Sequence, residues 1–250
     1  MLKGKVIITT QPADQAEEML MLLEAKGAKA LNLPMIETRT IRIHEEELSR
    51  LIQPGEFDLL VFTSKKGVRG FFENLSDFQS DFNLPSHIKI AVVGQATGAE
   101  LEKYGHKAAF PNPGTDARDL AKFLLENASI AGNKILLAVG NKAPDFLETT
   151  LSEMATVKRI NVYETIPLSR VDEQIAGLVK NREADICIFT SPSGFYAFLD
   201  AFQNAESLLL AAIGNTTALA IKECGYDVAV TAPYPSAQSL VQAIDDYFSE

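Results

Sequence analysis

Short apolar runs alternate along the chain with longer segments of helical periodicity. The runs are rich in Val, Ile, Leu and Phe and are bounded by Gly, Pro or polar residues, as buried strands are. Between them, apolar residues recur every three or four positions, as in Ala16, Met19, Leu20 and Leu23, which predicts helices. Such alternation is typical of α/β proteins with mostly parallel sheets. Strands are expected at 5–10, 29–33, 57–62, 88–93, 106–110, 134–139, 157–163, 185–189, 208–213 and 227–230.

Two stretches alternate apolar and polar residues instead. They are 33–43 (LPMIETRTIRI) and 159–167 (RINVYETIP), which share a Glu-Thr pair 127 positions apart, at Glu37 and Glu164. Pro167 ends the second stretch, because a proline cannot donate to a strand ladder. We expect these two segments to be the strands at which the chain crosses between two lobes, with Tyr163 in the space between the lobes.

The two halves of the chain resemble each other. FDLLVFTSKKG at 57–67 matches ADICIFTSPSG at 184–194 with an offset of 127, whereas Gly94 matches Gly214 and Thr97 matches Thr217 with an offset of 120. We attribute the change of offset to extra residues in the first half, in the loop that holds 76–86. The repeat predicts two similar α/β lobes, each a mostly parallel sheet flanked by helices and joined by a two-stranded hinge.

Four matched turns are candidates for ligand binding. Each follows a predicted strand, after Phe62, Val93, Phe189 or Ile213, and each opens a helix with hydroxyl or glycine residues. Ligands of parallel sheets bind beyond the carboxyl ends of the strands, and helix N-termini favour anions. Any helix start prefers Ser, Thr or Gly, so one such turn alone is equally well explained as a cap. Four of them in two related lobes predict an anion-binding cleft. The candidate binding residues are Thr63, Ser64, Lys65, Gly94, Thr97, Ser191, Ser193, Gly194, Gly214, Thr216 and Thr217.

Composition narrows the possible functions. A net charge of −10 argues against a broad nucleic-acid interface, and it means that an anionic ligand must be held by local features. No apolar run approaches the length of a membrane helix, and Val6-Ile7-Ile8 is too short for a signal-peptide core. We therefore expect a cytoplasmic protein with no membrane partner.

Other sites are disfavoured by spacing. The histidines, His44, His87 and His106, are scattered, so no metal site is predicted, and the two cysteines, Cys187 and Cys224, are expected to be small buried hydrophobes. The glycine-rich nucleotide motifs and the G-x-S-x-G motif of serine hydrolases do not occur.

Taken together, these blocks resemble the uroporphyrinogen-III synthase family across nearly the whole chain. The similar blocks are 62–64 (FTS), 93–97 (VGQAT), 162–165 (VYET), 189–194 (FTSPSG) and 212–218 (AIGNTTA). One departure is Lys65-Lys66 after the first Thr-Ser pair, where the family commonly has a proline. The departure leaves these lysines as candidate cationic contacts.

The resemblance implies a layout and an activity. Residues 1–37 and 168–250 would form one lobe and 38–167 the other. The protein would be a cofactor-free lyase of haem, sirohaem and cobalamin biosynthesis. It would cyclise hydroxymethylbilane, a linear tetrapyrrole with many carboxylates, with loss of water and inversion of the terminal pyrrole ring through a spiro intermediate. We expect a monomer that receives its substrate from the preceding enzyme of the pathway.

Tyr163 has two interpretations. From the residues alone it is an aromatic that packs against one lobe, whereas the resemblance favours a catalytic role, in which its neutral phenol protonates the departing hydroxyl. Glu164 is expected on the other face of the strand. Two other functions stay open at this point: a non-enzymatic two-lobed protein that closes over an anionic small molecule, and a glycosyl transferase.

Overall fold

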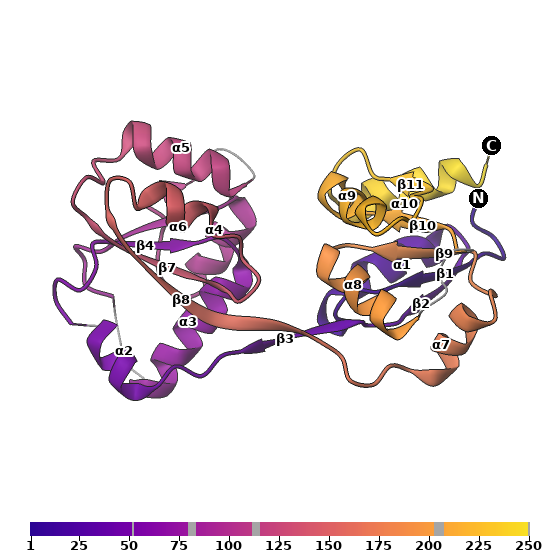
Figure 1. Ribbon diagram of the computed structural model, residues 1–250, viewed down its shortest axis with the longest axis horizontal. Helices are drawn as coiled ribbons and strands as arrows, with labels where there is room; N and C mark the ends of the chain where they lie inside the picture. The colour runs from indigo at the N-terminus through magenta and orange to yellow at the C-terminus, as the bar shows by residue number, and fades with distance from the viewer. Residues whose placement is uncertain (52, 80–83, 112–115, 203–207, 250) are drawn as a thin grey trace. The chain divides into compact units, whose positions relative to one another are not determined.

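The computed structural model describes residues 1–51, 53–79, 84–111, 116–202 and 208–249. Its contacts divide the chain into two compact units (Figure 1): unit 1 contains Met1–Thr38 and Ile166–Glu250, and unit 2 contains Arg39–Thr165. Both units are parallel-rich sheets flanked by helices, which confirms the predicted α/β class. The lobe division implied by the resemblance, 1–37 with 168–250 and 38–167, stays a prediction.

Unit 1 is a five-stranded sheet covered on both faces. The strand order is β11-β10-β9-β1-β2, and all its pairs are parallel. The strands are β1 (Val6–Thr9), β2 (Lys29–Asn32), β9 (Ile186–Phe189), β10 (Leu210–Ala212) and β11 (Val230–Thr231). Their central members are continuous apolar runs because both faces are buried.

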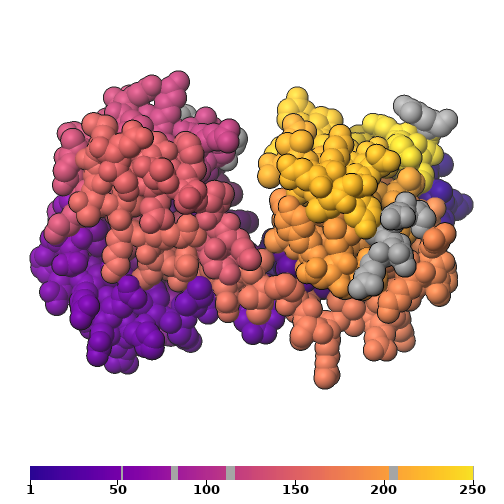
Figure 2. Space-filling model, viewed as in Figure 1, coloured from indigo at the N-terminus to yellow at the C-terminus, as the bar shows by residue number. Residues whose placement is uncertain are grey.

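The helices of unit 1 pack on these faces through two apolar clusters. The first cluster joins α7 (Glu173–Lys180), α8 (Pro192–Ala201) and α9 (Asn215–Glu223) to one face of the sheet, and the second joins α1 (Glu17–Ala25) and α10 (Ala237–Tyr247) to the other. Figure 2 shows that orange to yellow atoms, from the segment that contains α8, α9 and α10, form much of the face of unit 1 that is turned to the viewer.

Unit 2 repeats this plan with six strands. The order is β3-β8-β7-β4-β5-β6, and the pairs from β8 to β6 are parallel. The strands are β3 (Ile36–Thr40), β4 (Leu59–Phe62), β5 (Lys89–Val92), β6 (Phe110–Pro111), β7 (Lys134–Gly140) and β8 (Thr156–Pro167). One face is covered by α2 (Glu45–Leu51), α3 (Lys65–Phe78) and α4 (Gln95–Glu102), and the other by α5 (Ala117–Asn127) and α6 (Phe146–Leu151).

Several sequence-based expectations are corrected. The segment after β1 begins as a 3-10 turn, η1 (Ala13–Gln15), and α1 starts only at Glu17. The edge strands β6 and β11 are shorter than predicted, two residues each, since each pairs on one side only. Part of the extra length of the first half lies within a helix, because α3 has 14 residues and its counterpart α8 has 10.

The two cysteines differ from each other. Cys187 is fully buried in β9, as predicted, and burial raises the pKa of its thiol to about 12. Cys224 is exposed, which contradicts the prediction. It is the residue that ends α9, beyond the buried stripe of Ala218 and Ile221, so its side chain leaves the core.

Helix α3 lies unusually close to the sheet of unit 2. A β-carbon at Gly70 would lie 2.4 Å from the carbonyl oxygen of Val162 in β8, and one at Gly67 would lie 2.8 Å from that of Ala138 in β7. The side chains of Phe62, Phe71 and Phe72 fill the space beside this contact in a mutually packed group. Two glycines thus allow α3 to rest on the backbone of the sheet, which fixes the position of its N-terminus.

A buried carboxylate ties α3 to α4. Glu100 is 4% exposed, and its two oxygens accept from Arg69 Nε at 2.6 Å and Lys103 Nζ at 2.9 Å. The hydrogen bond from Arg69 is the main cause that lowers the pKa of Glu100 to about 2. Burial opposes this shift, and Lys103 adds to it.

We expect Glu100→Gln to lower the free energy of unfolding by about 1–3 kcal/mol near neutral pH, the range for hydrogen bonds to charged groups. Because the folded pKa lies below the ordinary value of 4.5, this contribution is present above that value and is lost as the pH falls towards about 2. Urea unfolding of the natural protein and of Glu100→Gln, near neutral pH and at about pH 3, measures the difference in their free energies of unfolding. Glu102→Gln, a change of an exposed carboxylate on the same helix, is the control. A destabilisation that did not shrink at low pH would contradict this assignment.

Candidate functional site

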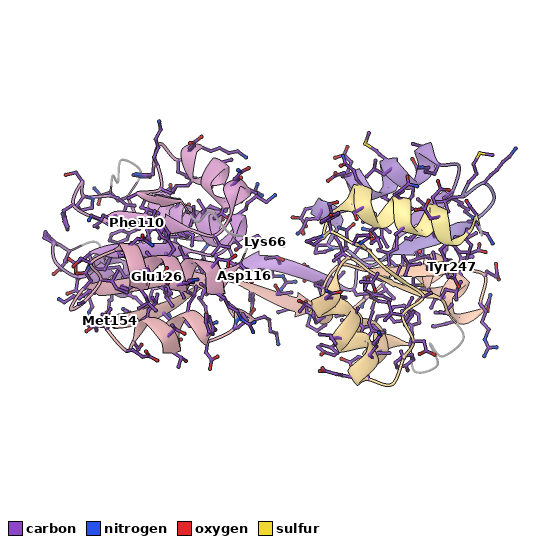
Figure 3. The ribbon with its side chains drawn as sticks, turned by 90° about the horizontal axis from the view of Figure 1, so that it is seen from above. Lys66, Phe110, Asp116, Glu126, Met154 and Tyr247 are labelled. Atoms are coloured by element: carbon purple, nitrogen blue, oxygen red, sulfur yellow. The ribbon has the colours of Figure 1, made fainter. Side chains whose placement is uncertain are left out.

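The N-terminus of α3 carries the first group of candidate residues. Ser64 is the N-cap, and its hydroxyl oxygen accepts from the backbone N–H of Gly67 at 3.1 Å. Thr63 is half-buried beside it, and Lys65 is exposed as the first residue of the helix. Lys66, labelled in Figure 3, follows in the first turn. The close approach of α3 to the sheet therefore places a capped and fixed serine at the end of β4.

Tyr163 meets this serine because β8 carries an irregularity. The pairing with β7 runs from Val139 opposite Asn161 to Gly140 opposite Tyr163, so β8 holds one extra residue there. The phenol ring then lies directly on Gly140: a β-carbon at that glycine would be 2.4 Å from Cζ and 2.8 Å from the hydroxyl oxygen. Ser64 Oγ donates to this oxygen at 3.2 Å. The Tyr163 oxygen thus accepts from Ser64, so the phenol proton is not used in this hydrogen bond.

Both interpretations of Tyr163 agree with part of this geometry. The ring is half-buried and packs on the apolar cluster of unit 2, as a structural aromatic would. Its hydroxyl is also hydrogen-bonded to a side chain that is itself fixed, which packing alone does not require.

Unit 1 has a pocket at the corresponding helix starts. Ser191 caps α8 by accepting from the N–H of Gly194 at 3.2 Å, and its Oγ lies 3.2 Å from that of Ser193. The pocket has a volume of about 400 Å³, and none of its described lining residues is charged. It brings together four predicted residues, Ser191, Gly214, Thr216 and Thr217. The sequence reasoning missed its other lining residues: Thr190, Pro192, Ile213, Asn215, Ala232, Pro233 and Pro235.

Two helices begin without a side-chain cap next to a pocket. Within the described ranges, α3, α5, α7, α8 and α10 each begin with a Ser or Asp that accepts from the first turn. In contrast, α9 and α4 begin at Gly214 and Gly94 and have no such acceptor, as is also true of α1 and α6. Gly214 lines the pocket of unit 1, and Gly94 lines a second pocket of about 340 Å³ in unit 2, with Glu102 and Lys107. The first N–H groups of α4 and α9 are therefore available to an external acceptor.

The remaining candidates are not all at a surface. Thr97 is only 4% exposed and Gly194 is buried, so their side chains have little access to a ligand. The structure places candidates at three sites: the Ser64–Tyr163 pair, the pocket at Gly94 and the pocket at Gly214. Thr97, Ser193 and Gly194 are not among the residues that line these two pockets. Gly140 was missed by the sequence reasoning, although its place at the end of a predicted strand was a usable signal.

The described part of the chain lacks two other features that could indicate a function, a metal-binding group and a membrane-spanning helix. There, no three His, Cys, Asp or Glu side chains are grouped so that they could hold a metal ion. None of the helices in the described ranges has the length and apolar character to cross a membrane.

Comparison with known sequences gives a consistent result. The sequence model of the family described as uroporphyrinogen-III synthase HemD matches residues 17–242. The uroporphyrinogen-III synthase of Chlorobaculum parvum is 29% identical over 248 residues, which cover 96% of this chain and 98% of that protein. The porphyrin biosynthesis protein HemD of Ruminiclostridium josui is 25% identical over 224 residues, 89% of this chain but 44% of the longer relative.

Solved structures share the fold. A mutant uroporphyrinogen III synthase from the extremely thermophilic bacterium Thermus thermophilus superposes with a TM-score of 0.66 at 17% identity, covering 98% of this chain and 99% of the other. The uroporphyrinogen-III synthetase of Helicobacter pylori gives 0.65 at 23% identity, covering 97% and 99%. The match to the family model and the curated relatives, not the shared fold, favours the enzyme over a binding protein without turnover.

The two capping serines provide a matched pair of variants. We expect Ser64→Ala and Ser191→Ala each to lower the free energy of unfolding by about 1 kcal/mol, the usual effect of losing a serine N-cap. Both serines cap a glycine N–H, and each has one further hydroxyl partner, so the two effects should be similar. Urea unfolding followed by circular dichroism measures them. A loss confined to one of the two variants would show that the caps are not equivalent.

Proposed function

The chain belongs to the uroporphyrinogen-III synthase family, and we propose that it takes hydroxymethylbilane as its substrate and acts on it as a monomer. The protein is an enzyme of porphyrin biosynthesis, a lyase that closes a linear tetrapyrrole into a ring. The match over residues 17–242 is the observation that supports this activity. The reaction removes the terminal hydroxyl as water and joins the chain ends with inversion of the last pyrrole ring. We also propose that the substrate passes directly from the enzyme that makes it.

The enzyme has to assist the loss of the hydroxyl only modestly. Its main task is to hold the two ends of the substrate in the reactive arrangement. The pyrrole nitrogen pushes electrons towards the carbon that bears the hydroxyl, so the leaving group departs with little assistance. The harder task is to direct that carbon to the substituted position at which the spiro intermediate forms. Holding the two chain ends in the reactive arrangement is a positioning effect, which is worth several orders of magnitude in favourable cases.

We propose that the substrate carboxylates bind at the helix starts. The uncapped N–H groups of α9 and α4, beside Gly214 and Gly94, offer donors and the positive ends of helix dipoles. Thr216 and Ser191 add hydroxyls in the unit 1 pocket, whereas Thr63 and Lys65 are the corresponding candidates in unit 2. Such a site binds anions without a basic surface, which suits a chain with a net charge of −10.

Tyr163 is our candidate for the proton donor. Its oxygen accepts from Ser64 Oγ at 3.2 Å, and this interaction orients the phenol so that its proton points away from Ser64. Donation to the departing hydroxyl leaves a phenolate that the Ser64 hydroxyl stabilises. The proton released later from the inverted pyrrole ring can restore the phenol.

We expect Tyr163→Phe to lower kcat by about 10²-fold, the lower end for a positioned acid, because the leaving group already departs with help from its own ring. KM and the melting temperature should change little, since the ring still packs on Gly140. The assay follows formation of the type III isomer, because closure without ring inversion gives a different product. Tyr104→Phe is the control, since that ring stacks on Phe72 elsewhere in unit 2. Full turnover by a folded Tyr163→Phe protein would rule out the proton-donor role.

A variant at Gly214 tests carboxylate binding. Gly214 has φ 179° and ψ 177°, an extended conformation open to any residue, and an added β-carbon would make only an ordinary contact of 3.6 Å with Pro235. An aspartate there should cap α9 with its own carboxylate and occupy the N–H groups meant for the substrate. We expect Gly214→Asp to raise KM at least about 10-fold, as expected for loss of hydrogen bonds to a charged group. Stability should stay the same or rise.

Gly214→Ala is the matched control, because it adds the β-carbon without the carboxylate. Its KM should stay close to that of the natural protein. Equal KM values for the aspartate and alanine variants would contradict carboxylate binding at the start of α9.

A further inference from the structure

The turn that follows β7 is held by an arginine from the neighbouring strand. Arg159 in β8 donates from Nη2 to the carbonyl oxygen of Gly140 at 2.9 Å and from Nη1 to that of Ala143 at 3.0 Å. Its third nitrogen, Nε, donates to Asn161 Oδ1 at 3.1 Å. The turn is also closed internally by the N–H of Ala143, which donates to Gly140 at 3.0 Å. One guanidinium therefore binds both ends of the turn.

The partners of Arg159 indicate that it holds the main chain in place and does not mainly pair with a carboxylate. A guanidinium presents a rigid planar set of donors that commonly pairs with carboxylates. Here its short contacts go to neutral oxygens, and the carboxylate of Glu148 lies farther away, at 4.0 Å from Nη1. The side chain of Arg159 is only 19% exposed. Since backbone carbonyls cannot change rotamer, these bonds fix the position of the main chain at Gly140 and Ala143.

Asn141 fastens the same turn to β8 on the other side. Its backbone N–H donates to the carbonyl oxygen of Tyr163 at 3.0 Å, and its Oδ1 accepts from the N–H of Thr165 at 2.9 Å. These bonds enclose the irregularity at which Tyr163 comes to face Gly140. The turn and the segment around Tyr163 therefore form one hydrogen-bonded assembly.

A displacement of the turn would directly move the Tyr163 hydroxyl. No atom separates the ring from the backbone of Gly140, because a β-carbon there would already be 2.8 Å from the phenol oxygen. The distance from that oxygen to Ser64 Oγ is 3.2 Å, so a shift of about one ångström would break the contact. Misplacement on that scale can reduce catalysis by about 10²-fold.

We infer that Arg159 is a positioning residue for the reaction: it fixes the turn at Gly140 so that the Tyr163 hydroxyl stays on Ser64. This inference rests on the proposed role of Tyr163 as proton donor. Arg159 itself does not touch the reacting atoms. If Arg159 only stabilised unit 2, its mutation would also lower activity through loss of folded protein. The test must therefore separate a positioning role from a purely stabilising one.

The test is a double-mutant cycle in kcat. We expect Arg159→Met to lower kcat by about 10–10²-fold with KM changed by less than about 3-fold, because ground-state binding does not depend on the phenol. In a Tyr163→Phe background the same change should cause little further loss. Arg159→Lys should restore little of kcat, because lysine lacks the rigid planar fork that holds two nitrogens at the spacing of the Gly140 and Ala143 carbonyls. Lys158→Met, on an exposed neighbour in the same strand, should leave kcat unchanged.

A second measurement does not depend on activity. Fluorotyrosine placed at position 163 alone reports the surroundings of that ring by ¹⁹F NMR, although the chain has six tyrosines. We expect its resonance to shift or broaden in Arg159→Met and to stay unchanged in Lys158→Met. If Tyr163→Phe is silent while this change is still seen, Arg159 fixes the position of the Tyr163 ring, but the proton-donor role fails and with it the role of Arg159 in the reaction. An unchanged resonance, with equal kcat losses in both backgrounds, would overturn the inference.

Discussion

The packing of unit 2 depends on three glycines, at positions where there is no room for a β-carbon. At Gly67 and Gly70 the backbone of α3 meets carbonyl oxygens of the sheet, and at Gly140 the backbone of β7 meets the ring of Tyr163. The first two contacts determine how close the helix lies to the sheet, and so where Ser64 stands at its N-terminus. The third determines where the phenol lies. The hydrogen bond between Ser64 and Tyr163 is the result of all three, because neither partner could reach the other if the layers were farther apart.

The structure also shows where the two repeats diverge. Ser64 and Ser191 both cap a helix in the same way, but the counterpart of Gly70 in α8 is Ala197, and the counterpart of Tyr163, 127 positions earlier, is Ile36. Ile36 is 5% exposed and belongs to the core of unit 1. Both units therefore share a serine-capped helix start, and among the described residues the hydrogen bond from such a serine to a tyrosine hydroxyl is found in unit 2. If Tyr163 is the proton donor as we propose, the catalytic role of unit 2 follows from a few substitutions on a shared plan.

The sequence was sufficient for the parts of the structure that depend on local pattern. The alternation of apolar runs with helical periodicity identified the strands and the α/β class, and the repeat of Thr63-Ser64 at Thr190-Ser191 located two helix starts correctly. Features that depend on packing in three dimensions could not be predicted from the sequence. Residues 33–43 and 159–167 look alike, and nothing in the pattern of 159–167 indicates the irregularity in β8 that turns Tyr163 onto Gly140. The contacts of Arg159 with Gly140 and Ala143 likewise span 19 and 16 positions, and no periodicity signals them.

The uncharged lining of the pocket in unit 1 has a consequence for how fast a substrate arrives. A protein that binds an anion with lysines and arginines attracts it from a distance, and added salt slows that encounter. If a polycarboxylate substrate binds this pocket as we propose, its donors there are backbone N–H groups and hydroxyls that act only at contact, and the net charge of −10 would repel it during its approach. Salt screens exposed charges beyond about 8 Å at physiological ionic strength, so moderate salt would then speed the encounter instead of slowing it. In that case the rate of capture would rise with ionic strength, while the short-range hydrogen bonds at the helix starts would change little.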